Sequence, residues 1–123
     1  MSAPNLIAGN VIYGVSTGAN LTTTSTTSII SNAASSGHVY KVNTLNAANW
    51  TATAATVTVS YYTAAALGGT AYPIVSNVTV PAYSTFNVLD RGTLYYLAEN
   101  TSFGAKAGTA NAIVITASYE DIS

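Results

Sequence analysis

Apolar and polar residues alternate with a period of two along much of this chain, as expected for strands that bury one face. In one segment Val57, Val59 and Tyr61 share a phase, while Thr58 and Ser60 take the other. Turn residues separate the segments, and no window repeats its apolar residues with a helical period. The pattern predicts strands within residues 6–13, 22–30, 38–48, 56–62, 72–80, 85–89, 94–97, 103–107 and 112–120.

These segments amount to about eight short antiparallel strands, which is typical of a sandwich or a barrel. Thr, Val, Ile and Tyr dominate the sequence, and they suit a pleated, half-buried surface. We therefore predict an all-β protein with one β-sandwich domain over residues 1–123. A jelly-roll-like sandwich is the first choice and an immunoglobulin-like sandwich the second. The Thr/Ser run at 22–28 is expected to form a polar edge strand, because apolar residues bracket it.

The composition indicates a surface that partners cover. Hydrophobic residues make up 49% of the chain and charged residues only 6%, against about 25% in ordinary domains. A free monomer usually stays soluble through its charge. The net charge of -1 and the separation of Lys41, Arg91 and Lys106 argue against nucleic-acid binding, which needs clustered cations. The absence of cysteine excludes disulfides and thiolate metal sites.

No targeting or spanning segment is evident. Residues 1–5 lack the basic and apolar regions of a signal peptide. No apolar stretch approaches the ~20 residues that cross a bilayer. We expect synthesis in the cytoplasm and no membrane partner. The missing signal peptide and the missing cysteines also argue against a cell-surface or pilus-like subunit.

Candidate catalytic residues are few. His38 is the single histidine, and a triad or metal site would require convergent partners around it. A small hydrolase would need His38 beside a hydroxyl and a carboxylate. We predict no enzymatic activity, no cofactor and no metal. The carboxylates are Asp90, Glu99, Glu120 and Asp121. The Asn-x-Ser/Thr triplets at Asn20, Asn49, Asn77 and Asn100 are attributed to composition.

Aromatic residues carry the functional potential of the sequence. Tyrosine offers a large contact area and a polar tip at low entropic cost, so it is favoured at interfaces. Neither Tyr61–Tyr62 nor Tyr95–Tyr96 can point both rings inward from a regular strand. A sugar-stacking platform is the alternative use of outward rings. The candidate interface residues are Trp50, Tyr62, Tyr83 and Tyr96.

The carboxy-terminal half resembles small virion structural proteins of tailed bacteriophages. The similarity follows a Pro-Ala turn and strand at 81–89, a turn at 90–92, short strands at 94–99 and 102–107, and the ending Ser118-Tyr119-Glu120-Asp121-Ile122-Ser123. The opening, with residues 6–17, Thr-rich sequence and then Asn32-Ala33-Ala34, is also similar.

This resemblance implies a head decoration (cement) protein on the capsid exterior, made in the host cytoplasm. Such a protein would bind the major capsid protein and stabilise capsomer contacts. Cement proteins are often trimers, so a cyclic homotrimer is expected. The resemblance transfers no catalytic residue. The alternative is a tail, neck or fibre component with a host-surface or carbohydrate-binding role.

Overall fold

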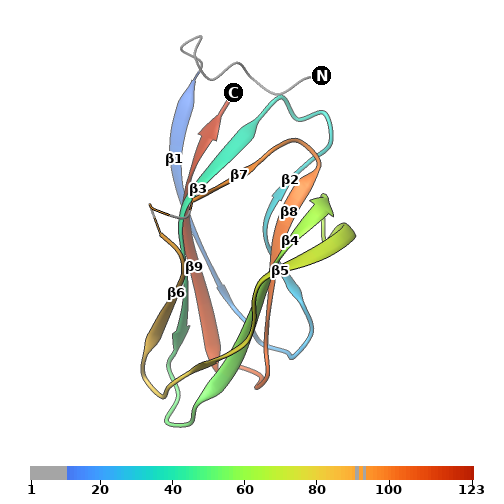
Figure 1. Cartoon of the computed structure of the whole chain (residues 1–123). Coiled ribbons are helices and arrows are strands. Elements are labelled where there is room, and N and C mark those ends of the chain that lie inside the picture. Colours follow the sequence, from blue (N-terminus) through green and yellow to red (C-terminus); the bar gives the residue numbers. More distant parts are fainter. Residues whose placement is uncertain (1–10, 91, 93) are drawn as a thin grey trace.

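The computed structural model describes residues 11–90, 92 and 94–123, which form two packed antiparallel sheets (Figure 1). Within these residues there are strands and turns but no helix, and therefore no helix that could cross a membrane. The strands are β1 (Ile12–Asn20), β2 (Thr27–Asn32), β3 (Val39–Asn49), β4 (Ala55–Ala64), β5 (Gly68–Val80), β6 (Thr85–Leu89), β7 (Tyr95–Leu97), β8 (Thr101–Ala107) and β9 (Ile113–Ile122).

The strand order is that of a jelly roll. Sheet A has the order β1-β9-β3-β6, with β7 also pairing with β3, and sheet B has the order β2-β8-β4-β5. The chain changes sheet at every connection except β4–β5 and β6–β7. The first strand therefore lies beside the last, and β2 lies beside β8, as in two intertwined Greek keys. This confirms the jelly-roll-like prediction, and the immunoglobulin-like second choice is wrong.

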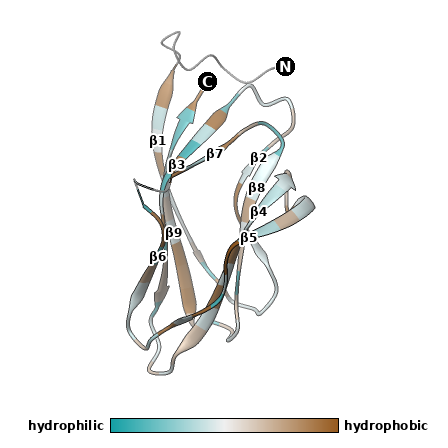
Figure 2. Cartoon of the chain, in the orientation of Figure 1, coloured by the Kyte–Doolittle hydropathy of each residue, from teal (hydrophilic) through white to brown (hydrophobic). Residues whose placement is uncertain are grey.

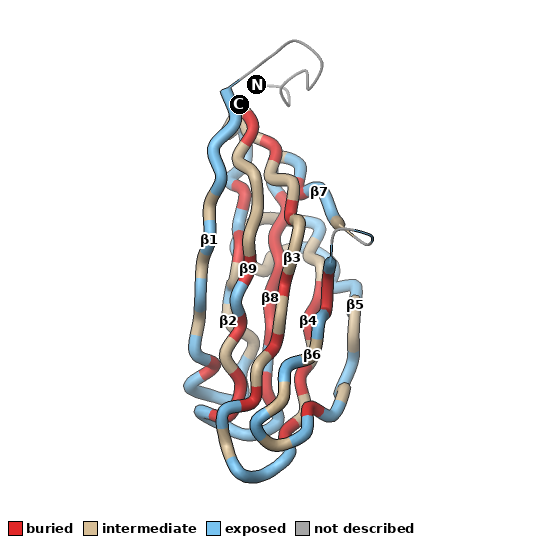
Figure 3. The backbone as a smooth tube through the Cα atoms, turned by 90° about the vertical axis from the view of Figure 1, so that its left-hand side faces the viewer, coloured by how far each residue is buried: buried red, intermediate tan, exposed pale blue. Residues whose placement is uncertain are grey.

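The core lies between the inner faces of the two sheets. Buried residues recur at every second position along parts of β3, β4 and β9, and most residues between them are only partly buried (Figure 3). In Figure 2 the brown colour of hydrophobic residues covers much of β9. The largest side chains with no more than 1% exposure are Phe103, Leu21, Leu45, Leu89, Leu97, Ile113 and Ile115.

Most predicted strands agree with the structure to within a few residues, and β6 matches its prediction. Three predictions need correction. Of the strand predicted at 6–13, residues 6–10 lie outside the described residues, and β1 instead continues to Asn20 because β9 pairs with it throughout. The polar run begins as a loop, in which Ser25 N donates to Thr23 Oγ1, so edge strand β2 starts only at Thr27. The strand predicted at 72–80 starts earlier, because β5 already begins at Gly68.

The buried side-chain amide of Asn49 connects the end of β3 to neighbouring segments through hydrogen bonds. Its Nδ2 donates to Thr53 O at 2.9 Å and to Val80 O at 3.0 Å. Its Oδ1 accepts from Thr51 N at 2.9 Å and from Thr51 Oγ1 at 2.7 Å. Because its side chain is only 2% exposed, the triplet at Asn49 belongs to the folded structure and is closed to glycosylation.

Replacing Asn49 with alanine should destabilise the fold by roughly 2 kcal/mol, because two carbonyls lose a donor in a buried site. The free energy of unfolding from urea titration measures this loss. Asn20→Ala, at an exposed position of β1, is the matched control and should change stability by no more than about 0.5 kcal/mol. Equal effects of the two substitutions would contradict the assigned role of Asn49.

Candidate interaction surface

Trp50 lies in the β3–β4 loop and Tyr83 in the β5–β6 turn, and hydrogen bonds connect these to each other and to the β8–β9 loop. These three connections lie at the lower end of the sandwich in Figure 1. The indole Nε1 of Trp50 donates to Asn111 O at 2.7 Å. Tyr83 N donates to Thr51 O at 3.2 Å, which attaches the β5–β6 turn to the residue after Trp50. The side chains are nevertheless 59% and 73% exposed, respectively. We call this pair and its supporting loops the aromatic end.

Tyr83 has a backbone conformation that normally suits glycine. Ser84 N donates to Pro81 O at 3.2 Å, which closes a four-residue turn with Tyr83 in its third position. The φ of Tyr83 is 54°, in the left-handed region. Such a conformation costs about 1–2 kcal/mol in a residue with a side chain. Tyr83 is therefore both strained and highly exposed, and six other non-glycine residues among those described share its left-handed φ.

A Tyr83→Gly substitution should stabilise the isolated protein by roughly 0.5–1 kcal/mol. Glycine relieves the left-handed strain, and its greater unfolded-state entropy offsets part of the gain. Tyr83→Ala keeps the strain and should not show this gain. Thermal unfolding of both variants measures the difference, and a Tyr83→Gly protein less stable than Tyr83→Ala would contradict the strain.

The other two predicted interface residues lie elsewhere. Tyr62 is half-buried on β4 and lines a groove on the outer face of sheet B with Thr26, Asn77 and Lys106. Tyr96 is half exposed on β7, opposite Lys41 of β3. The structure therefore gathers Trp50 and Tyr83 at one end but separates them from Tyr62 and Tyr96. An interface role for all four residues stays a prediction.

The two tyrosine pairs are divided between faces, as the sequence indicated. Tyr61 and Tyr95 turn toward buried Phe103, with ring centroids at 6.2 and 5.6 Å from it. Their sequence neighbours Tyr62 and Tyr96 are left on the outer surface. One ring of each pair thus contributes to packing, and the other is available to solvent or to a partner.

At the opposite end, where β3 begins and β9 ends, the structure assembles a polar cluster that no local sequence signal indicated. His38 Nδ1 lies 2.5 Å from Asp121 Oδ1, although 83 positions separate the two residues. The rings of Tyr40 and Tyr119 pack beside them with centroids 5.0 Å apart. Burial raises the pKa of both tyrosines, and the charge of Asp121 raises it further.

This cluster supplies the carboxylate that a His38 hydrolase would need. The hydroxyl of Ser36, two residues before His38, forms its hydrogen bonds with groups other than the imidazole. Ser36 Oγ donates to Asn32 Oδ1 at 2.5 Å and accepts from the backbone N–H of His38. The His38–Asp121 pair therefore joins the start of β3 to the end of β9. Across the described ranges, no group of three or more His, Cys, Asp or Glu residues could hold a metal ion.

The raised tyrosine pKa values predict a loss of stability at alkaline pH. Above the ordinary value of 10.0, the unfolded chain releases protons that folded Tyr40 and Tyr119 still hold. Unfolding is therefore favoured as the pH rises from about 10 through the raised pKa values. Urea midpoints of wild type and a Tyr40→Phe/Tyr119→Phe variant across this range measure the effect. The variant should show the shallower decline, and parallel curves would reject the assignment.

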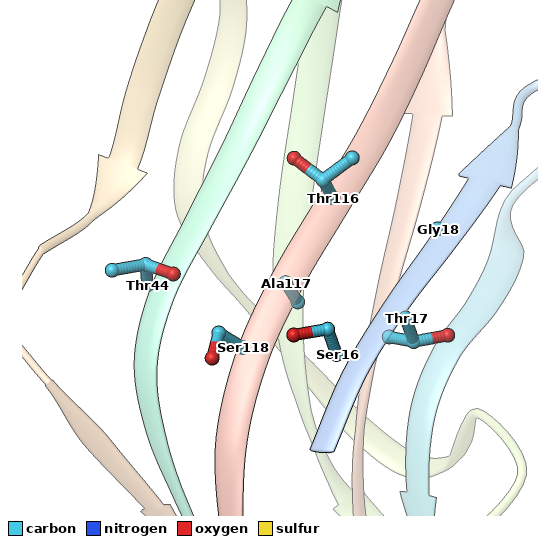
Figure 4. Close-up of a pocket in the computed structure, with 7 residues that line it drawn as sticks. All are labelled: Ser16, Thr17, Gly18, Thr44, Thr116, Ala117 and Ser118. Atoms are coloured by element: carbon cyan, nitrogen blue, oxygen red, sulfur yellow. The ribbon is translucent and has the colours of Figure 1, made fainter. Parts of the chain in front are cut away.

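A second surface on the outer face of sheet A is lined by hydroxyls. Figure 4 shows Ser16, Thr44, Thr116 and Ser118 around a shallow hollow over β1, β9 and β3. The residues that line it include no charged side chain. Such a surface offers hydrogen bonds and methyl contacts and has no electrostatic attraction for an ionic ligand.

No family model matches the chain, and no curated protein matches it. Among solved structures it is similar to a chain from work describing Bacillus endospore appendages as a novel family of disulfide-linked pili. The TM-score is 0.53 at 17% identity, with 92% of this chain and 87% of that one covered. A structure of infectious bursal disease virus, Gx strain, aligns with a TM-score of 0.45 and 9% identity, covering 91% of this chain and 32% of that one. The first likeness shows a shared β-sandwich fold, and neither finding shows a bacteriophage family.

Proposed function

We propose that this chain is a non-enzymatic structural subunit of a repeated surface assembly. In the specific form that we favour, it decorates the outside of a virion head and binds the major capsid protein. The observation that carries the proposal is the aromatic end, where Trp50 and Tyr83 are exposed on hydrogen-bonded loops.

The physical character of the aromatic end suits protein docking. Tryptophan and tyrosine are enriched among the residues that dominate binding energy at interfaces. The loops that carry Trp50 and Tyr83 are already tied together through Thr51 and Asn111, so less conformational freedom is lost on binding. Only 6% of the residues are charged. Few charged groups therefore lose their hydration when the surface contacts a partner, and the desolvation cost is small.

The assembly role is supported by chemistry and by fold. A decoration protein stabilises a shell through contacts that exist only after assembly. The solved structure of similar fold comes from endospore appendages described as pili, and this supports the broader class of surface subunit. The His38–Asp121 pair acts as a link between strands in this proposal. The homotrimer expected from the resemblance stays a prediction. The β1 dimer inferred below is a different assembly, and the mass measurement described there distinguishes the two.

Binding to particles that lack this chain tests the docking role. Trp50→Ala and Tyr83→Ala should each weaken binding about 30-fold or more, because each removes a large exposed ring from the contact. Tyr72→Ala is the matched control, since Tyr72 is 57% exposed on β5 and lies outside the aromatic end. Quantitative cosedimentation of purified protein with particles measures the affinity. Unchanged binding of both aromatic-end variants would exclude docking through this end.

A carbohydrate-binding tail, neck or fibre component is the second candidate, and Trp50 favours it. The indole edge is anchored to Asn111 O while most of the side chain is exposed, which is an arrangement that allows a sugar to stack on the ring. A glycan array hit that Trp50→Ala abolishes would support this role over capsid decoration. An array without hits for the wild-type protein would argue against it.

A further inference from the structure

β1 is an edge strand of sheet A, and none of the other described strands pairs with its outer side. It pairs with β9 over nine consecutive residues without a register shift, and the described residues place no strand of sheet A on its other side. Figure 3 shows β1 at the margin of the sandwich, exposed over most of its length. A free edge is a row of unpaired N–H and C=O groups, which can template pairing with another chain.

The register identifies which backbone groups are free. Val11 and Ser123 exchange both hydrogen bonds, at 3.0 and 2.9 Å, and Leu21 N donates to Ile113 O at 3.0 Å. In an antiparallel ladder, residues that bond to the neighbouring strand alternate with residues that do not. Odd-numbered residues of β1 therefore bond to β9. The residues whose groups point to the free side are Ile12, Gly14, Ser16, Gly18 and Asn20.

The other three edges of the sandwich have irregularities that disfavour pairing with another chain. β2 has an irregularity at Ser28/Ile30, and the pairing of β6 with β3 shifts at Leu45/Asn46. β5 contains Pro73 and pairs with β4 through three register shifts. Bulges and proline are the means by which proteins protect an exposed edge. β1 has no proline, no charged residue and no shift, so among the longer edge strands that the structure describes it keeps a regular, pairing-competent edge, whereas the unshifted β7 has only three residues.

We infer that β1 pairs antiparallel with β1 of a second copy of this chain, about a twofold axis at Ser16. In this register Ser16 faces Ser16, Gly14 faces Gly18, and Ile12 faces Asn20. Every one of these residues has free backbone groups, so the two strands satisfy each other with about ten hydrogen bonds. Sheet A then continues from one copy into the other.

Charge and side-chain size both fit a second copy as the occupant. Residues 11–20 carry no charge, so pairing brings no like charges into contact along the edge. The nearby carboxylates on β9 are already paired, Glu120 with Lys41 at 3.7 Å and Asp121 with His38 at 2.5 Å. A Cβ at Gly14 would have no neighbour within 4 Å, so this part of the edge is unobstructed.

The free edge also begins with exposed apolar side chains. Val11, Ile12 and Tyr13 are 52%, 57% and 63% exposed, respectively. The pairing register would place Ile12 and Tyr13 beside the end of the partner's β1 and cover part of this surface. The hydroxyl-lined hollow includes Ser16 and Gly18, so the hollows of the two copies would meet at the twofold axis (Figure 4).

Light scattering after size-exclusion chromatography tests the pairing on the full chain. The wild-type protein should have twice the 12.5 kDa mass of one chain. Ser16→Lys places like charges at the axis, and Ser16→Pro removes an N–H that β9 does not use, so each should give the monomer mass. Ser118→Lys is the matched control, because Ser118 is the β9 partner of Ser16 and also lines the hollow, one strand from the edge. It should remain a dimer.

Amide exchange measured by NMR gives a second, residue-specific readout. In the dimer, the N–H groups of Gly14, Ser16 and Gly18 should exchange slowly, and in Ser16→Lys those of both glycines should exchange fast. The amides of Val15 and Thr17 bond to β9 and should stay slow in both proteins. A wild-type monomer or trimer, a dimer that survives both Ser16 substitutions, or fast exchange at the even positions of a wild-type dimer would overturn the inference. No residue of the aromatic end is altered, so the outcome is independent of capsid or glycan binding.

Discussion

The packing of two inner sheet faces against each other is the constraint on which the rest of this structure depends. Fully burying one large apolar side chain contributes roughly 1.5–3 kcal/mol, and residues such as Phe103, Leu45 and Ile115 are wholly enclosed between the sheets. Because side chains alternate along a strand, burial of one face also determines which residues face outward. The connections then gather at the two ends of the sandwich, and this is how residues distant in sequence meet.

The buried side-chain amides of Asn49 and Asn32 form hydrogen bonds that connect segments at the two ends of the sandwich. Asn49 binds the loop after β3 and the end of β5, while Asn32 Nδ2 donates to His38 O at 2.8 Å and Leu97 O at 3.0 Å. Both side chains replace hydrogen bonds that loop carbonyls would otherwise make with water. Asn49 thus supports the end that carries Trp50 and Tyr83, and Asn32 supports the end where His38 contacts Asp121.

The scarcity of charge gives the outer surface its character. With 6% charged residues, the outer face of sheet A presents hydroxyls such as Ser16 and Thr116, and contacts through it depend on shape and hydrogen bonding. Three edges are interrupted by bulges or proline, whereas β1 is regular and uncharged. The aromatic end and the β1 edge are separate features, so one subunit can contact a foreign surface and a second copy at once.

The sequence by itself determined the all-β class, the sandwich and most strand positions, because periodicity and turn residues are local properties. It also indicated that Tyr61 and Tyr62 face opposite sides, since neighbours on a strand must. Tertiary structure alone decided the extent of β1, whose weak alternation at an exposed edge is overridden by pairing with β9. It also decided that His38 meets Asp121 and that Trp50 shares an end with Tyr83. These outcomes depend on which distant strands pair, and that choice follows from the burial of the whole core, which no local window contains.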